Sequence, residues 1–405
     1  MTRSNINLRQ YVQPFVVGAT LISLFFSVCG LILTAPPVYR GLGDFRQLYA
    51  AGYMVRTGQA AQLHDFAASD AVQDQVVGPA EGALPFNHLA VESLLYAPLT
   101  FLNYRAAYIA FLALNVALLV FACKLLLPYL MPLAEIWKFL PAAIFAAFLP
   151  VTLALAQGQD SILLLALLIA ALRAFDRGTD LTAGILVGLT LFKFQYGLPV
   201  ALLFLIWRRW RFLLGFAASA AAMVGTSLVL TGINGFFAYL HSLTEMSSSF
   251  SSTYGLRYGI HPNLMPNLRG LVQALALGPT PTAFHITAVL SLLVLIWAAT
   301  RRPSLPLAVL AAILVSYHHL ITDTTMVILP AALALTASLS SATNSRKDAV
   351  VALAALIFLV PALLLLAGVR FYLLAIPMLA LCIVWDGFYS LPLATQPIIK
   401  DPSHN

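Results

Sequence analysis

The chain has 405 residues, of which 61% are hydrophobic and only 9% are charged. A soluble globular domain carries about 25% charged residues, so these values exclude a water-soluble enzyme and an intrinsically disordered chain. Three scattered cysteines also exclude a disulfide scaffold. The sequence therefore predicts an all-α polytopic membrane protein. The net charge of +7 then bears on membrane orientation, and we do not expect nucleic acid as a partner.

The apolar runs predict about twelve transmembrane helices in one integral membrane domain covering residues 1–405. The first run has no charged residue and no small-residue cleavage site after it, so it is a retained span rather than a signal peptide. The expected spans are Phe15–Leu33, Ala106–Cys123, Phe139–Ala156, Ser161–Leu172, Leu181–Phe192, Gly197–Trp207, Phe212–Thr231, Ala283–Thr300, Leu305–Tyr317, Thr324–Leu339, Ala349–Val369 and Phe371–Trp385. Only Arg370 separates the last two runs, and a single long bent helix is the alternative there.

The distribution of charge orients these spans. Lys and Arg concentrate in cytoplasmic loops, and the sequence fits this rule when both termini are cytoplasmic, with residues 386–405 as a cytoplasmic tail. The basic cluster Arg208–Arg211 then lies inside only if the chain turns back at Lys193–Tyr196, which predicts a hairpin. Two long loops, residues 34–105 and 232–282, fall outside, as do all histidines except His404. We expect a multi-pass protein of the inner membrane whose active site faces the periplasm or exterior.

Asp44 is the candidate catalytic residue of the first long loop. It follows the first span and precedes a segment, containing Tyr49 and ending near Gly58, that suits an amphipathic helix lying on the membrane surface. A carboxylate at that place can act as a general base toward a hydroxyl. The alternative is that Asp44 only caps the helix that follows.

Lys193 stands at the turn of the predicted hairpin, between apolar residues. A lysine is costly near the hydrocarbon region, and two explanations remain open. Its ammonium group could bind a lipid phosphate, or its chain could extend to the interface without a ligand.

Another polar cluster, Ser316–Asp323, joins two later spans and contains His318 and His319. It could bind a metal, relay protons or hold a phosphate, and the alternative is hydrogen bonding that satisfies the loop backbone. The second long loop carries Arg257, Arg269 and several aromatic and amide side chains. These residue types suit sugar binding, and a polar cover over the core is the alternative.

The order of these motifs resembles glycosyltransferase family 87 of the GT-C superfamily, whose members use polyprenyl-phosphate sugars. The family includes the α-1,2-mannosyltransferases that elongate phosphatidylinositol mannosides. The elements that carry the resemblance are Asp44–Tyr49, Gly58, Leu63–Asp65, Pro85–His88, Pro98–Leu99, Gly158–Ser161, Ala183–Gly184, Gly188, Lys193, Gln195, Arg208–Arg211, Ser316, His318 and Asp323.

The resemblance implies a GT-C fold of about twelve transmembrane helices, with amphipathic helices in the long outer loops and residues 34–105 as the catalytic loop. It implies transfer with inversion, with Asp44 as the general base. Donor-phosphate binding is expected at Lys193, His318, Arg257 and Arg269. Substrate binding is expected at Tyr49, His88, Gln159, Gln195, His319 and Asp323. No Asp-x-Asp nucleotide-sugar motif is present, and we expect no metal and no other cofactor.

The predicted function is the transfer of a hexose, with mannose favoured, from a polyprenyl-phosphate donor to a hydroxyl of a lipid or glycan acceptor. Membrane lipids are the other expected partners. One alternative is a lipid or sugar flippase or transporter, which more often shows internal repeats and ionisable residues at mid-membrane. Another is a scaffold protein built on an inactivated transferase fold.

Overall fold

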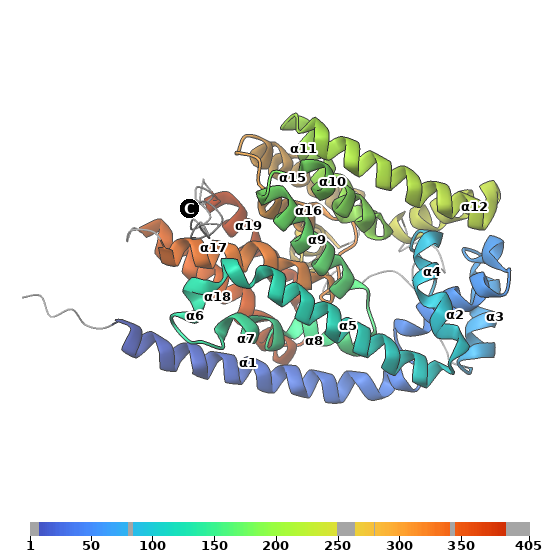
Figure 1. Cartoon of the computed structure of the whole chain (residues 1–405), viewed down its shortest axis with the longest axis horizontal. Helices are drawn as coiled ribbons and strands as arrows, with labels where there is room; N and C mark the ends of the chain where they lie inside the picture. The colour runs from blue at the N-terminus through green and yellow to red at the C-terminus, as the bar shows by residue number, and fades with distance from the viewer. Residues whose placement is uncertain (1–7, 80–83, 249–263, 279, 341–344, 386–405) are drawn as a thin grey trace, which may run out of the picture.

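The computed structural model describes residues 8–79, 84–248, 264–278, 280–340 and 345–385. Within these ranges the chain is helical without a β-strand, which confirms the all-α prediction. Figure 1 shows a bundle of long helices, with the short helices α2, α3 and α4 gathered at the end where α1 finishes. The helices are α1 (Leu8–Tyr39), α2 (Phe45–Arg56), α3 (Phe66–Val76), α4 (Ser93–Tyr96), α5 (Tyr104–Leu126), α6 (Met131–Ala134), α7 (Leu140–Ala146), α8 (Leu149–Gln157), α9 (Ser161–Asp176), α10 (Asp180–Gly188), α11 (Phe194–Ile206), α12 (Trp210–Ser248), α14 (Leu268–Val272), α15 (Pro281–Ala299), α16 (Leu305–Val315), α17 (Ile328–Ser340), α18 (Ser345–Leu366) and α19 (Ala375–Val384).

Six segments of the described chain are long and apolar enough to cross a membrane, which agrees with a polytopic membrane protein. They are Gln13–Tyr39, Tyr104–Tyr129, Asp180–Ile206, Trp210–Thr244, Pro281–Ala299 and Asp348–Leu366. The pair α7 and α8, bent by 47°, is a seventh if it counts as one span. The predicted number of twelve is not confirmed. Several predicted spans are short helices, such as α16 with 11 residues, which rises only ~16 Å.

The predicted hairpin is present between α10 and α11. Asp180, at the start of α10, forms an ion pair of 3.1 Å between its Oδ2 and Nη2 of Arg209, which follows α11. A straight helix over Asp180–Ile206 would hold its ends ~40 Å apart, so this apolar segment folds back. The reversal uses the 3-10 turn Leu189–Lys193, which places Lys193 at the tip of the hairpin.

Small residues hold α10 against α12. A Cβ atom added to Gly184 would lie 1.9 Å from the Phe212 carbonyl oxygen, and one added to Gly215 would lie 2.1 Å from the Leu181 oxygen. Side chains at these positions would force the two backbones apart, so glycine permits the close approach. This contact fixes the hairpin and therefore the position of its tip.

The first long loop has a core of its own. Phe45 of α2 stacks on Phe111 with ring centroids 5.3 Å apart, and Tyr49 and Tyr104 pack edge to face at 5.5 Å. The helix expected here exists and ends just before Gly58, whose φ of +78° stops it. Most of its residues are buried, because α3, α4 and residues 97–101 cover it. Its apolar side chains therefore pack against the protein itself.

Two further expectations can be compared with the later part of the chain. Part of the second long loop is helical, as the resemblance implies, because α12 continues to Ser248 beyond a break at Gly232, where φ is +69°. The last two predicted spans are separate helices, and the alternative of a single helix across Arg370 is wrong, because Gly368 and Val369 have φ of +82° and +59° and end α18. The chain resumes as α19, which packs against α18. Residues 386–405 lie outside the described part of the chain.

Candidate active site

A polar cavity of about 130 Å³ lies between the first long loop and the tip of the α10–α11 hairpin. Its walls come from five segments: the start of α2, residues 84–88, the junction of α8 and α9, the hairpin tip, and residues 317–323. The predicted site residues that line it are Asp44, His88, Gln159, Lys193, Gln195, His318 and Asp323. The fold therefore brings together side chains that are up to 279 positions apart by their numbers in the sequence.

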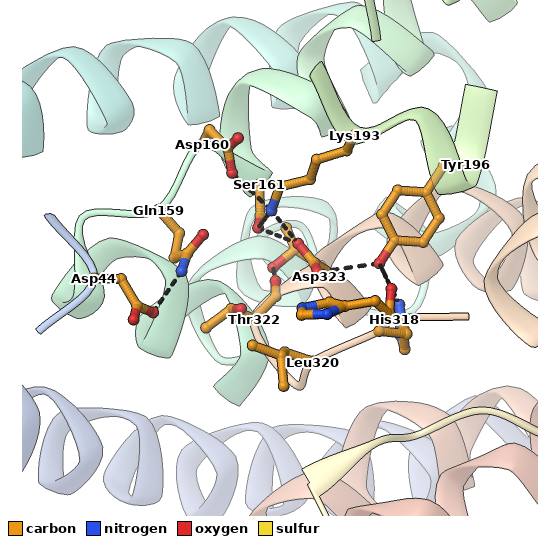
Figure 2. A network of polar contacts seen from close by, with 12 residues as sticks. Asp44, Gln159, Asp160, Ser161, Lys193, Tyr196, His318, Leu320, Thr322 and Asp323 are labelled. Atoms are coloured by element: carbon orange, nitrogen blue, oxygen red, sulfur yellow. Dashed lines mark hydrogen bonds and ion pairs between the residues drawn. The ribbon is translucent and has the colours of Figure 1, made fainter. Parts of the chain in front are cut away.

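Asp44 faces this cavity with a carboxylate that serves no capping role. It occupies the residue before α2, but its side chain makes no capping hydrogen bond. One carboxylate oxygen instead accepts a 2.5 Å hydrogen bond from Nε2 of Gln159, as Figure 2 shows. Burial raises the pKa of Asp44 above its ordinary value, while the Gln159 hydrogen bond and the charge of Lys193 oppose that shift.

Gln159 is held by the turn between α8 and α9. Gly158 ends α8 in the left-handed region, at φ +64°, and a Cβ there would approach the Cβ of Phe45 to 2.8 Å. The backbone oxygen of Gln159 also accepts a 3.2 Å hydrogen bond from Asn115. The turn is therefore fixed on both sides, and the amide of Gln159 is directed toward Asp44.

Lys193 lies in a buried network rather than at an interface. It is 5% exposed, and its Nζ lies 2.7 Å from Oδ1 of Asp160 and 2.5 Å from Oδ1 of Asp323. Ser161 donates to Asp323 at 2.7 Å and accepts from Lys193 at 3.2 Å. These groups converge in Figure 2. Extension of the lysine to the interface is therefore excluded, and two carboxylates offset its charge.

A second cation, His88, stands beside the same network. Its Nδ1 pairs with Glu92 and lies 3.4 Å from Oδ2 of Asp160, and Tyr96 donates to Glu92 at 3.0 Å. Burial alone would lower the pKa of His88, but the two carboxylates outweigh it and raise the pKa to about 10. Burial also raises the pKa of Glu92 to about 7. His88 is therefore an imidazolium in the cavity wall at neutral pH.

The two histidines of residues 317–323 differ from His88, because their pKa values are lowered rather than raised. Burial lowers the pKa of His318 to about 3 and that of His319 to about 4, so both rings are neutral near pH 7. His318 lines the cavity, whereas His319 is buried behind it, where its Nδ1 lies 2.8 Å from the Tyr196 hydroxyl. Tyr196 in turn donates to Asp323 at 3.1 Å. His318 can therefore offer a hydrogen bond to a ligand but not a positive charge.

Three other predicted residues do not line the cavity. Tyr49 is buried in the first-loop core, and its hydroxyl donates to the Leu102 oxygen at 2.7 Å. Arg269 donates to the Tyr317 oxygen at 2.7 Å and supports the segment behind the cavity. His319 holds Tyr196 as described above. Arg257 lies outside the described residues.

Four residues of this polar network were not among the predicted site residues. Asp160, Ser161, Tyr196 and Glu92 are as buried and as connected as the predicted residues. The signal was available for Lys193, because a lysine that stays charged when buried requires a carboxylate partner. Asp160 adjoins Gln159 in the sequence and was the nearest candidate.

One group of described side chains has the spacing of a metal site. Ligand atoms of His88, Glu92 and Asp160 lie within 4.8 Å of one another. The same atoms already make the ion pairs given above, and Lys193 occupies Asp160 from the other side. In the described structure two protein cations, His88 and Lys193, therefore lie against the carboxylates of this group.

Residues 92–322 match the family model of glycosyltransferase family 87. The chain belongs to glycosyltransferase family 87. The matched region contains Gln159, Lys193 and His318, while Asp44 precedes it and is joined to it by the hydrogen bond to Gln159. Comparison with curated proteins and with solved structures gives no match. As a member of this family the protein is a glycosyltransferase, and donor and acceptor substrates are its general partners.

Proposed function

We propose that the protein transfers a hexose, most simply mannose, from a polyprenyl-phosphate sugar to a hydroxyl of a lipid or glycan acceptor, with inversion at the anomeric carbon. The family assignment supports sugar transfer in general. The observation that carries the finer proposal is the Asp44 carboxylate, which is open to the cavity, free of a capping role and held by Gln159. A flippase or transporter has no comparable support in the family assignment.

In the proposed reaction Asp44 is the general base. The acceptor oxygen forms a bond to the anomeric carbon as Asp44 takes the hydroxyl proton, and the bond from that carbon to the phosphate oxygen breaks. The phosphate keeps the electron pair and leaves as an anion. A base with a raised pKa removes a proton more effectively, and burial acts in this direction on Asp44. Gln159 keeps the carboxylate in place during the proton transfer.

The leaving phosphate requires positive charge rather than an acid. Among the residues first expected to bind it, Lys193 and His318 line the cavity. Since Asp160 and Asp323 offset Lys193, and His318 is neutral, we propose that the His88 imidazolium and Lys193 together stabilise the departing anion. Gln159, Gln195 and Asp323 would orient the sugar hydroxyls.

We also propose that this chemistry occurs at the periplasmic or outer face of the inner membrane, with both termini in the cytoplasm. The helices α9, α11 and α16 all run between the cavity and the end of the bundle that carries Arg209 and Arg301. Because basic residues concentrate on the cytoplasmic side, this arrangement supports an outward-facing cavity. No metal is needed in the proposed reaction, since the cations of the site are side chains.

The test is transfer from radiolabelled polyprenyl-phosphate mannose to a membrane lipid extract by the purified full-length protein. We expect Asp44→Asn to lower the rate by ~10²–10⁴ while the thermal midpoint stays near that of the wild type. Asp70→Asn, an acidic residue of the same loop that does not line the cavity, is the matched control and should keep its activity.

Two results would overturn parts of the proposal separately. Full transfer by Asp44→Asn would remove the general base from its role. Transfer by the wild type from a nucleotide sugar, but from no polyprenyl-phosphate sugar, would show that the proposed donor class is wrong. The role of Asp44 would then be tested by comparing Asp44→Asn with the wild type on the nucleotide sugar.

A further inference from the structure

Gln47 of α2 is a polar residue in the wall of the candidate active site whose side-chain oxygen has no partner among the described residues. It lines the cavity and is only 9% exposed, and no described group donates a hydrogen bond to its Oε1. A buried polar group without a partner is uncommon in folded proteins and calls for an explanation. Because this side chain borders a cavity, a ligand is the partner that the structure leaves open for it.

Helix α2 places Gln47 beside Asp44. Asp44, the residue before α2, already has helical φ and ψ of −62° and −30°, so Gln47 follows it by three positions along one helical path. Side chains three apart on a helix are neighbours, and both of these line the cavity. Phe45 and Tyr49 turn the other way, into the core of the first loop. The Gln47 amide is therefore a neighbour of the proposed base.

Packing fixes this face of α2 in place. A Cβ atom added to Gly52 would lie 2.6 Å from the backbone carbonyl carbon of Tyr96, so α2 lies directly against α4. Nη2 of Arg46 lies 2.6 Å from Oδ1 of Asp74, which connects α2 to α3. The direction of Gln47 is thus set by a packed helix rather than by a loose loop.

The cavity has two walls that belong to different parts of the chain. Asp44, Gln47 and Asn87 lie on the first-loop wall, and Lys193 lies on the wall formed by the helical bundle. His88 ends the first-loop wall and lies 3.4 Å from Asp160, which also pairs with Lys193. Figure 2 shows Asp44 and Lys193 on opposite sides of Gln159. The proposed base and the cations of the site are therefore separated across the cavity.

This separation places the acceptor. In a transfer with inversion, the nucleophile approaches the anomeric carbon from the face opposite to the leaving group. The phosphate leaves toward His88 and Lys193, so the acceptor hydroxyl approaches from the side of Asp44. The acceptor then lies against the first-loop wall, where the Gln47 amide stands next to the base.

We propose that Gln47 binds the acceptor, and that the acceptor is a sugar unit, free or on a lipid, rather than an alcohol with one hydroxyl group. This inference rests on the proposed function and narrows its acceptor class. Asp44 takes the proton of the attacking hydroxyl, while Gln47 forms a hydrogen bond with a second hydroxyl on a neighbouring carbon. A monohydroxy alcohol would leave Gln47 buried without a partner, and a site built to bind a hydroxyl rejects an analogue that lacks it.

The acceptor class is tested with compounds that share one alkyl tail. The purified full-length protein is given radiolabelled polyprenyl-phosphate mannose and octyl α-mannoside, its monodeoxy analogues, or octanol. Octyl α-mannoside presents both cis and trans pairs of neighbouring hydroxyl groups. We expect octanol to be a poorer acceptor by at least about tenfold in kcat/KM. The analogue without the reacting hydroxyl should give no product, and an analogue without its neighbour should lose about tenfold in kcat/KM.

Gln47→Leu removes the amide and keeps a side chain of similar size. We expect it to raise the acceptor KM about tenfold with the donor KM unchanged, and to abolish the penalty for the missing neighbouring hydroxyl. The thermal midpoint should not fall, because leucine leaves no polar group unpartnered. Gln75→Leu, at an exposed glutamine of α3 outside the cavity, is the matched control and should behave as the wild type. A merely structural role of Gln47 would lower the midpoint and keep the discrimination between analogues.

Acceptor binding is also measured without any donor, so that this proposal and the proposed function can fail separately. Saturation-transfer NMR on the full-length protein in nanodiscs follows the binding of octyl α-mannoside, which Gln47→Leu should weaken about tenfold. If the wild type transfers mannose to none of the acceptors, the proposed reaction is wrong, and the binding measurement still decides the role of Gln47.

Three outcomes would overturn the proposal. Equal transfer to octyl α-mannoside and octanol would show that the acceptor need not be a sugar. Unchanged binding of octyl α-mannoside in Gln47→Leu, or an unchanged penalty for every deoxy analogue, would remove Gln47 from the acceptor site. A higher donor KM with an unchanged acceptor KM in Gln47→Leu would assign the amide to the donor sugar instead.

Discussion

The Asp44 carboxylate accepts a 2.5 Å hydrogen bond from the amide of Gln159, 115 positions away in the chain. This bond connects the first long loop, which supplies the proposed base, to the helical bundle, which supplies the cations. It also opposes the rise in the pKa of Asp44 that burial causes. The proton affinity of the base therefore depends on a residue of another element.

Replacing Gln159 should change the pH dependence of transfer. Because its hydrogen bond stabilises ionised Asp44, Gln159→Leu raises the pKa of that carboxyl and moves the acidic limb of kcat/KM to higher pH. A bond to a charged group contributes ~1.5–3 kcal/mol, so we expect a rate loss of ~10–100-fold at neutral pH. Gln62→Leu, an exposed glutamine of the same loop, is the control. An unchanged pH profile in Gln159→Leu would separate Gln159 from the base.

Part of this site could be predicted from the sequence, and the rest depends on contacts that only the fold creates. Asp44, Lys193 and His318 stand out because ionisable residues are scarce in apolar surroundings. Tyr49 belongs to the same motif as Asp44, but α2 turns its ring into the loop core, and helix orientation is not visible in a motif. Asp160 and Tyr196 become evident only when the fold places them against Lys193 and Asp323.

The fold, like the site, was predictable from the sequence only in part. Composition indicates a helical membrane protein, and the charge of Arg208–Arg211 indicates the hairpin that Asp180 and Arg209 close. The number of spans was not predictable, because a run of apolar residues of the length of α16 can be a buried helix as well as a span. Burial between neighbours, which decides this, is a property of the packed bundle.

Lys193 should be required for folding as well as for activity. Lys193→Met leaves Asp160 and Asp323 buried without their shared cation, and breaking a buried pair costs ~3–5 kcal/mol. We expect a lower thermal midpoint and loss of transfer. The double variant Lys193→Met with Asp323→Asn removes one of the stranded charges and should recover part of the thermal midpoint without activity. No recovery in the double variant would mean that the ion pair is not the source of the loss.

His88 should stabilise the protein most at low pH. Its pKa is about 10 in the folded chain and near 6.5 when unfolded, so the folded state holds a proton that the unfolded state releases. The resulting stability is fully present below about pH 6.5 and is lost as pH rises toward 10. His88→Gln should therefore lower the thermal midpoint more at about pH 6 than at about pH 9.5. An equal decrease at both values would mean that the ring is not charged in the folded protein.

The contact between α10 and α12 should not tolerate a methyl group at Gly184. The added Cβ would lie 1.9 Å from the Phe212 carbonyl oxygen, which is backbone and cannot rotate away. Overpacking of this kind costs ~1–3 kcal/mol, so Gly184→Ala should lower the thermal midpoint and displace the hairpin tip. Gly225→Ala lies on α12 in open space and should be neutral or slightly stabilising. Equal behaviour of the two variants would mean that the helices are not in contact there.

Transfer should survive removal of divalent metals. The donor atoms of His88, Glu92 and Asp160 approach a metal-site spacing, but they pair with one another, and Lys193 holds Asp160 at 2.7 Å. A dication would have to displace the His88 proton, whose pKa of about 10 opposes that exchange near neutral pH. We therefore expect full activity in protein treated with EDTA and assayed without added metal. Loss of transfer that Mg²⁺, Mn²⁺ or Zn²⁺ restores, and that Glu92→Gln abolishes, would instead make this cluster a metal centre and His88 one of its ligands.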